Sequence, residues 1–142
     1  MTINQLSIFI ENRSGTLIRV LDILKQSNIQ IIASTIADTA EYGIYRLICS
    51  EPARAYEELK QAGVAVAISD VFALELDNEP GKAADAVRII SDAGLSITYM
   101  YTFLWGGKGI LIFRTDQTER AHEIIIQNKL RFIAEKELAE GV

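Results

Sequence analysis

The clearest feature of the chain is an alternating apolar pattern that stops at a loop with a glycine and gives way to a helical pattern. Leu6, Ile8 and Ile10 recur at every second residue, which is the period of a half-buried β-strand. After Gly15, Leu17 opens an apolar stripe that continues at the i+3, i+4 and i+7 positions, the spacing of an amphipathic helix. The start of the chain therefore predicts a strand, a loop and a helix.

The segments that follow complete a unit of alternating strands and helices. Residues 29–37 are rich in Ile, Ala and Thr, and a polar turn separates them from the apolar run 44–49, which predicts two strands. Pro52 suits the first turn of a helix that Gly63 ends, and residues 64–68 predict a short fourth strand. The order of elements is βαββαβ.

The same pattern starts again 66 residues later, so the chain is a tandem repeat. Phe72 begins the second copy of the first strand, Gly81 repeats Gly15, and residues 131–135 predict the last strand. We expect two domains, residues 1–70 and residues 71–142.

The two repeats are expected to depend on each other, because a unit of this size has a core that barely stabilises a free domain. Only Ser69, Asp70 and Val71 separate their adjoining strands, which leaves no flexible linker. Residues 29–37 and 110–113 are apolar on both faces, so helices on one side of a sheet cannot cover them. We expect a second chain, stacked sheet to sheet in a homodimer, to cover the other face.

The net charge of −5 argues against two classes of partner. An acidic chain has few cations to neutralise nucleic-acid phosphates or an anionic membrane surface, so neither partner is expected. The βαββαβ order also occurs in RNA-recognition modules, but residues 108–113 carry Ile and Leu where such modules stack bases on aromatic rings. The chain shows no signal-peptide pattern and no apolar run near the roughly 20 residues of a membrane span. A lone Cys49 allows no internal disulfide, and the expected location is the cytoplasm.

Catalytic chemistry is hard to assemble from these residues. The single histidine, His122, falls on the polar side of a helix, and Cys49 lies in an apolar run as a small core residue. The sequence contains no metal-ligand spacing, so we expect no catalytic residue, no metal and no cofactor. Residues 106–109 predict a hairpin turn, since a strand follows them. The alternating aromatic run 99–105 indicates sheet packing or an interface, with a ligand platform as the alternative.

The loops after the first strand of each repeat are the candidate binding sites. A strand that turns directly into a helix leaves backbone N–H groups exposed at the positive end of the helix dipole, which favours an anion. A free amino acid offers a carboxylate for these groups. Its ammonium group suits carbonyl or amide oxygens such as those of Asn12 and Asn78.

The two loops carry the resemblance to a known family. The first reads Glu-Asn-Arg-Ser-Gly-Thr-Leu and the second reads Asp-Asn-Glu-Pro-Gly-Lys-Ala. With the helix, Ile-rich strand and hairpin that follow, the first loop resembles the ACT domain, the amino-acid-sensing module of amino-acid metabolism. It is especially similar to the regulatory domain of phosphoglycerate dehydrogenase, whose motif is Glu-Asn-Arg-Pro-Gly-Val-Leu. The two loops in register identify nearly the whole chain as a tandem ACT domain protein.

The resemblance implies an α+β fold in which two ferredoxin-like βαββαβ units lie side by side, forming an antiparallel eight-stranded sheet with helices on one face. It also implies ligands at the seam, between the strand–helix loop of one unit and the second strand of the other. Gln30 and Ser96 open the second strands where serine-sensing relatives have asparagine, and Ile10 replaces their histidine, which leaves the ligand open. The ligand-binding positions carried over are Asn12, Arg13, Ser14, Gly15, Thr16, Leu17, Gln30, Asn78, Glu79, Pro80, Gly81, Lys82, Ser96 and Ile97.

We therefore expect a regulatory, non-catalytic sensor that binds a free amino acid at the interface between two ACT units. Its partner would be an enzyme of amino-acid metabolism. The first loop would face Ser96, Tyr99 and Tyr101, so its socket is expected to prefer histidine or an aromatic amino acid. Two alternatives stay open: a small ferredoxin-like enzyme, which would need a general base in a cleft, and a structural oligomerisation module.

Overall fold

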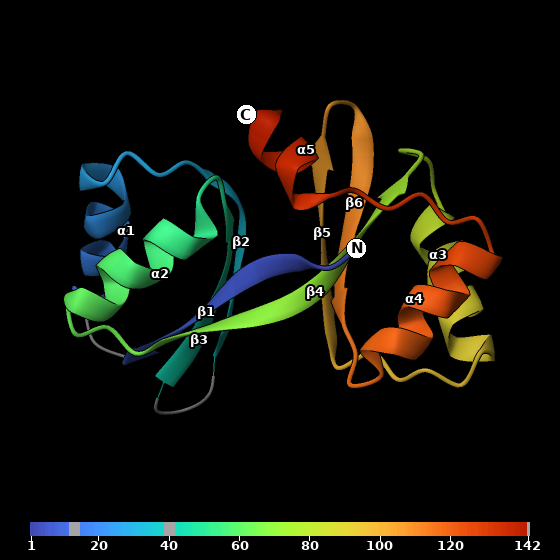
Figure 1. Cartoon of the computed structure of the whole chain (residues 1–142), viewed down its shortest axis with the longest axis horizontal. Helices are drawn as coiled ribbons and strands as arrows, with labels where there is room; N and C mark the ends of the chain where they lie inside the picture. The colour runs from blue at the N-terminus through green and yellow to red at the C-terminus, as the bar shows by residue number, and fades with distance from the viewer. Residues whose placement is uncertain (12–14, 39–41, 142) are drawn as a thin grey trace. The chain divides into compact units, whose positions relative to one another are not determined.

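The computed structural model describes residues 1–11, 15–38 and 42–141. Figure 1 shows an α+β fold, as the sequence predicts. Its elements are β1 (Ile3–Glu11), α1 (Thr16–Gln26), β2 (Ile31–Asp38), β3 (Tyr42–Cys49), α2 (Pro52–Gln61), β4 (Val66–Leu76), α3 (Lys82–Asp92), β5 (Tyr99–Trp105), β6 (Lys108–Arg114), α4 (Thr118–Gln127) and α5 (Glu135–Glu140).

The chain divides into two compact units. The N-terminal unit comprises Asn4–Ser69 with Leu138–Glu140, and the C-terminal unit comprises Met1–Ile3, Asp70–Glu137 and Gly141. β4 gives its first residues to the N-terminal unit and its last residues to the C-terminal unit.

In the N-terminal unit, β3 lies between β1 and β2 and is antiparallel to both. Leu6 of β1 pairs with Leu47 of β3, so these residues face the same side of the sheet. On the other side of β1, the N–H of Phe9 donates to the carbonyl of Ala65 at 2.9 Å, just before β4 begins.

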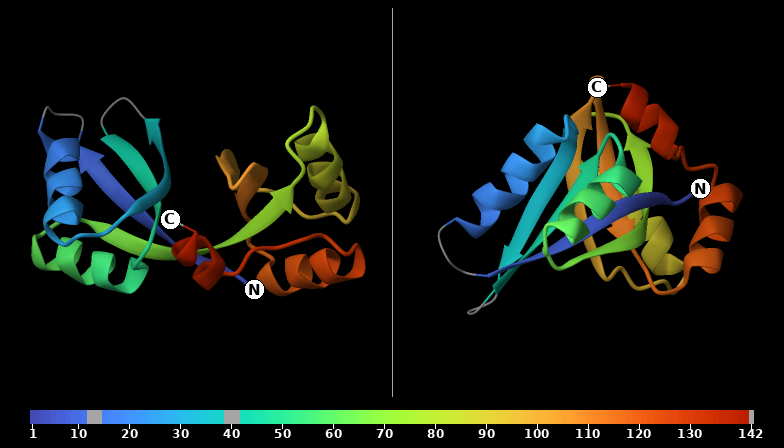
Figure 2. Two further views of the ribbon diagram at one scale, coloured as in Figure 1. Left: turned by 90° about the horizontal axis from the view of Figure 1, so that it is seen from above. Right: turned by 60° about the vertical axis from the view of Figure 1, so that its left-hand side comes forward.

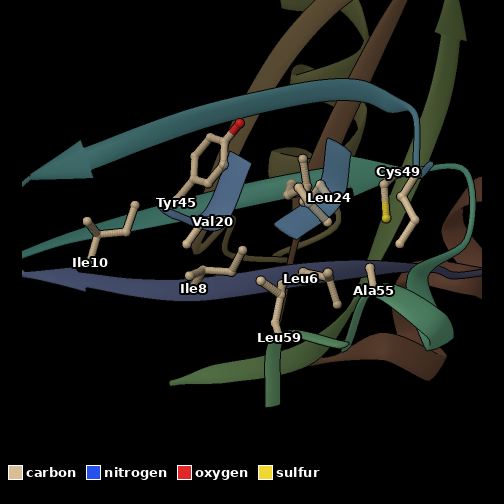
Figure 3. Packing of buried hydrophobic residues seen from close by; sticks show 11 residues of the cluster. Leu6, Ile8, Ile10, Val20, Leu24, Tyr45, Cys49, Ala55 and Leu59 are labelled. Carbon is tan, nitrogen blue, oxygen red and sulfur yellow. The ribbon is translucent and has the colours of Figure 1, made fainter. Parts of the chain in front are cut away.

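Helices α1 and α2 bury their apolar stripes against one face of this sheet. Figure 3 shows Leu6 and Ile8 of β1 in one cluster with Val20 and Leu24 of α1 and Leu59 of α2. Val20 and Leu24 are one turn apart on α1, and both are buried. Burying a side chain of this kind contributes about 1.5–3 kcal/mol, which is why the amphipathic pattern determines the face on which the helix packs.

The C-terminal unit repeats this arrangement. β6 lies between β4 and β5 and is antiparallel to both, and the register pairs Phe72 with Phe113. Their rings stack with centroids 5.1 Å apart, and Ala86 and Ile90 of α3 and Ile125 of α4 complete the core. Figure 2 shows α3 and α4 beside the sheet of their own unit. The 66-residue repeat extends to single hydrogen bonds, since Glu75 donates to Arg131 at 2.9 Å as Phe9 does to Ala65.

The predicted count of eight strands is wrong for the described residues, which contain six in the order β2-β3-β1-β4-β6-β5. Residues 64–68 and the strand starting at Phe72 were expected as two strands, but residues 66–68 and Phe72 belong to one continuous strand, β4 (Val66–Leu76). Between them stand Ser69, Asp70 and Val71, none of which is the proline or glycine that would force an extended chain to turn.

The strand expected at 131–135 is also wrong, because only Phe132 forms an isolated bridge, to Leu74 of β4. Helix α5 begins directly afterwards at Glu135. The side chain of Glu137 accepts a hydrogen bond from the N–H of Ala134 at 3.3 Å, and both glutamates lie in the positive first turn of the helix. Local capping therefore overrides the apolar pattern at this point.

A fragment of residues 1–70 is expected not to fold cooperatively. It cuts β4 in the middle and removes Leu138 of α5, a buried residue that belongs to the N-terminal unit. The measurement is urea or thermal unfolding followed by circular dichroism, with the full chain as reference. A sharp transition near the midpoint of the full chain would show that the N-terminal repeat is independently stable.

Candidate functional site

Both predicted loops turn into their helices through a glycine in the left-handed region. Gly15 has φ 94° and precedes α1, and Gly81 has φ 86° and precedes α3. Thr16 Oγ1 donates to the carbonyl of Glu11 at 2.8 Å, which ties the two ends of the first loop together. A β-carbon at either glycine would meet no atom within 4 Å, so the backbone angle accounts for the residue type.

Of the predicted ligand-binding positions, Asn12, Arg13 and Ser14 lie outside the described residues. Leu17 packs against the core of the N-terminal unit, which gives it a structural role. Pro80 is exposed.

A pocket of about 710 Å³ lies beside the first loop, within the N-terminal unit. It brings together the end of β1, the start of α1, the first residue of β3 and the turn before β4. Its lining comprises Phe9, Ile10, Glu11, Gly15, Thr16, Arg19, Val20, Tyr42, Gly63, Val64 and Ala65. We call it the N-terminal pocket.

The N-terminal pocket combines groups for an anion with exposed aromatic rings. The guanidinium of Arg19 donates to the carbonyl of Ala62 and forms no ion pair within the part of the chain that the structure describes. The first turn of α1 has no acidic residue to offset the positive end of its dipole. Phe9 and Tyr42 are 50% and 43% exposed, with ring centroids 6.4 Å apart. The pocket also has an acidic residue, Glu11.

The C-terminal unit has a pocket in the equivalent place, of about 260 Å³, which we call the C-terminal pocket. Adding 66 to Phe9, Glu11, Arg19 and Ala65 gives four of its lining residues, which are Glu75, Asp77, Asp85 and Arg131.

Two of the residues that line this pocket, Asp77 and Arg131, form ion pairs. Lys108 Nζ lies 3.0 Å and a guanidinium nitrogen of Arg131 lies 3.1 Å from Asp77 Oδ1, and Arg131 also lies 3.9 Å from Glu75. The hydrogen bond from Lys108, and then that from Arg131, lowers the pKa of the Asp77 carboxyl below its ordinary value. The C-terminal unit therefore has charged side chains, Arg131 and Lys108, at the positions where the N-terminal unit has Ala65 and Tyr42.

A third pocket, of about 390 Å³, lies between the second loop and the β5–β6 hairpin of the same unit. It brings together three predicted positions, Asn78, Glu79 and Lys82, and adds Thr102 and Phe103 of β5. Lys82 Nζ lies 3.9 Å from Glu79 Oε2, so its charge is partly compensated.

The predicted second-strand positions lie away from the loops of their own units. The N–H of Gln30 donates to Ser50 Oγ at 3.0 Å, at the end of the sheet where Ile31 pairs with Cys49. Glu11 lies at the other end of the sheet. In the C-terminal unit, Ser96 and Ile97 likewise precede β5 at the end of the sheet away from the second loop. Ile97 packs against the core of this unit. Their part in a socket with the other unit's loop stays a prediction.

Sequence reasoning missed Arg19, Tyr42 and Ala65, because they come from three separate elements that only the fold brings together. Comparing the two repeats could have pointed to these positions, because each differs in charge from its counterpart 66 residues later: Asp85, Lys108 and Arg131. Cys49 is buried in the N-terminal core, as predicted, and His122 is exposed on α4.

The comparison with protein families identifies the class of protein to which this fold and its paired loops belong. The family model described as the ACT domain pair matches residues 1–142, so the chain belongs to this family. The resemblance inferred from the two loops is confirmed.

Solved structures extend the comparison. Protein BT0572 from Bacteroides thetaiotaomicron is 36% identical, with a TM-score of 0.93 over 99% of this chain and 97% of that one. The ligand-free regulatory subunit of aspartate kinase from Thermus thermophilus shares the fold, with 14% identity and a TM-score of 0.62 over 87% of this chain and 91% of that one. The corresponding subunit from Thermus flavus gives 16% identity and a TM-score of 0.58 over 87% and 90%.

No curated protein matches the chain. Within residues 1–11, 15–38 and 42–141, no helix has the length and apolar character needed to cross a bilayer.

Acid unfolding should depend on Asp77. Because its pKa is lowered in the folded state, the ion pairs stabilise the fold above the unfolded pKa of about 3.9, and this stabilisation is lost as the pH falls through the folded value. Asp77→Asn is expected to lower stability at pH 7 and to leave it nearly unchanged near pH 2. Urea unfolding at both values measures this.

The matched control for that experiment is Asp116→Asn, since Asp116 has no ion pair among the described residues. An equal loss at pH 7 for both variants would mean that the Asp77 pairs add nothing to stability. High salt should reduce the difference between the variants, because these groups are exposed.

Proposed function

We propose that the chain is a regulatory sensor of a free amino acid, with residues 1–70 and 71–142 as its two ACT domains. The observation that carries the proposal is the N-terminal pocket, where the helix that follows Gly15 and the guanidinium of Arg19 offer an anion site beside exposed aromatic rings. The first loop is the stronger socket and the second loop the weaker one. Gln30, Ser96 and Ile97 belong to the seam implied by the family and remain a prediction.

The regulatory part of the proposal draws on relatives. The chain spans 91% of the length of a protein named as a regulatory subunit of aspartate kinase, and the two share a fold. By this analogy the ligand-bound chain acts on an enzyme of amino-acid metabolism, and it does no chemistry itself.

The described residues support a non-catalytic role in two ways. No group of three His, Cys, Asp or Glu side chains within them could hold a metal ion. The residue types used as nucleophile or base are poorly placed, since Cys49 is buried in an apolar core and His122 is exposed outside the pockets described above. A structural module without a ligand is another alternative, and amino-acid binding separates it from the proposed sensor.

Histidine or an aromatic amino acid should stabilise the chain. A small ligand held by a few hydrogen bonds binds with about −4 to −8 kcal/mol, which corresponds to millimolar to micromolar affinity. At about 100 times its dissociation constant it adds roughly 2.7 kcal/mol to the free energy of unfolding. Differential scanning fluorimetry with a panel of amino acids measures the shift. No shift with any amino acid would favour the structural module.

Two glycine variants locate the socket. Gly15 and Gly81 both have positive φ, so Gly15→Val and Gly81→Val introduce the same kind of backbone strain. Each variant is compared with its own ligand-free midpoint. Gly15→Val should abolish the ligand shift and Gly81→Val should keep most of it. If Gly81→Val alone removes the shift, the second loop is the socket.

A homodimer is expected from exposed apolar residues. Of the two apolar stretches that suggested a partner chain, 110–113 is already buried in the single chain, so the proposal rests on the outer strands β2, which lies within the other stretch and its continuation, and β5. These strands expose Ile36 (49%), Met100 (41%) and Leu104 (67%). Light scattering at micromolar concentration should report twice the chain mass of 15.8 kDa. A monomer would contradict it.

A further inference from the structure

We propose that the C-terminal segment formed by α5 and Gly141 is a latch, in which the backbone of Gly141 packs against the indole of Trp105 and restrains the tip of the β5–β6 hairpin. Trp105 and Gly141 both belong to the C-terminal unit. The latch is a conformational device that needs no bound amino acid, so it goes beyond the proposed function.

The latch segment is an addition to the repeat. Residues 69–74, which lie 66 positions before α5, are in the middle of β4, so α5 has no counterpart in the first repeat. The helix is nevertheless held in place, because Leu138 is 1% exposed. The N–H of Gly141 donates to the carbonyl of Glu137 at 3.1 Å, which joins Gly141 to the last turn of α5.

Glycine stands at position 141 for reasons of space. Gly141 has φ −80° and ψ −2°, which any L-residue adopts, so its backbone does not require a glycine. A β-carbon there would lie 2.7 Å from both Cε2 and Nε1 of Trp105, whereas carbon atoms in contact lie about 3.5–4.0 Å apart. Gly15 and Gly81 are the opposite case, with a positive φ and no atom within 4 Å of a β-carbon. The backbone of Gly141 therefore packs directly against the indole.

Trp105 lies at the tip of a tight hairpin. It is the last residue of β5 and pairs with Lys108, the first residue of β6. Gly106 and Gly107 between them have φ 58° and 79°, and two positive φ values in a two-residue connection are typical of a type I′ turn. Because such a short turn couples the two strands closely, a contact that fixes Trp105 also restrains Lys108.

The hairpin tip has one other restraint on the page of contacts within this unit, the ion pair between Lys108 Nζ and Asp77 Oδ1 at 3.0 Å. Both side chains are exposed, so salt and water weaken this pair. Residues 102–104 of β5 and Gly109 of β6 line the third pocket. The contact between Gly141 and Trp105 thus affects how firmly one wall of that pocket is held.

The indole N–H makes the latch reversible. Trp105 Nε1 is buried and has no hydrogen-bond partner among residues 1–11, 15–38 and 42–141. Water solvates this N–H when the segment is released, so burial without an acceptor lowers the stability of the docked state. The apolar area of the ring favours docking. These opposed contributions keep a docked and a released state close in free energy.

Trp105 reports on the latch because it is the only tryptophan of the chain. In the full chain, Gly141→Ala should shift the fluorescence emission to longer wavelength and increase quenching by acrylamide, because displacement of the segment exposes the indole to water. It should also lower the midpoint of thermal unfolding. Without the contact the midpoint should rise, since alanine at a compatible φ restricts the unfolded chain.

Gly109→Ala is the matched control. Gly109 is also a glycine without a positive φ, and the atom nearest to a β-carbon there lies 3.7 Å away, an ordinary contact. This variant should leave emission and quenching unchanged and should not lower the midpoint. If Gly141→Ala gives the same result as Gly109→Ala, the latch is overturned.

Hydrogen exchange followed by mass spectrometry tests the effect on the hairpin. In Gly141→Ala, exchange should become faster in residues 99–114 and stay unchanged in residues 42–49 of the N-terminal unit. Stronger quenching without faster exchange in residues 99–114 would mean that the segment covers the indole without restraining the hairpin, which also overturns the latch.

The wild-type chain provides a test that needs no variant. Its indole should be shielded, so acrylamide should quench Trp105 less than it quenches free N-acetyltryptophanamide. Equal quenching overturns the latch even if Gly141→Ala does not fold.

Discussion

The structure depends on one backbone constraint, the change from strand to helix within a few residues at a positive φ. L-residues with a β-carbon avoid this region, and Gly15 and Gly81 occupy it at φ 94° and 86°. The turn directs the first helix of each unit onto one face of its sheet, where Val20 and Leu24, or Ala86 and Ile90, become buried. It also leaves the first N–H groups of the helix exposed beside a pocket.

The two repeats show how duplicated backbone can carry different chemistry. The hydrogen bond from Phe9 to Ala65 recurs from Glu75 to Arg131, so the local geometry is retained while the side chains change from aromatic and small to charged. In one copy these side chains leave a cavity, and in the other they form ion pairs around Asp77. The fold is common to the family, but the site is particular to each repeat.

The sequence predicted those features that local patterns determine. Period-2 alternation identified β1, helical spacing identified the buried face of α1, and the glycines identified both loops. The sequence did not predict that β4 is continuous. It also predicted a strand at 131–135, where a helix, α5, begins at Glu135 with a hydrogen bond from the N–H of Ala134 to the side chain of Glu137. The N-terminal pocket was missed because Arg19, Tyr42 and Ala65 are joined only by tertiary structure, and no single segment contains its pattern.

The ion pairs across the C-terminal pocket bear on the shape of the response. Arg131 and Lys108 already contact Asp77 in the C-terminal unit, so the sensor proposed above would hold one ligand molecule per chain, in its N-terminal pocket. Occupancy of a single site follows a simple saturation curve, without cooperativity inside the chain. A steeper, switch-like dependence on amino-acid concentration requires coupling between the pockets of separate chains, since cooperativity is a free energy shared by at least two sites. For the proposed sensor, the difference between a graded and a switch-like response would therefore depend on contacts between chains.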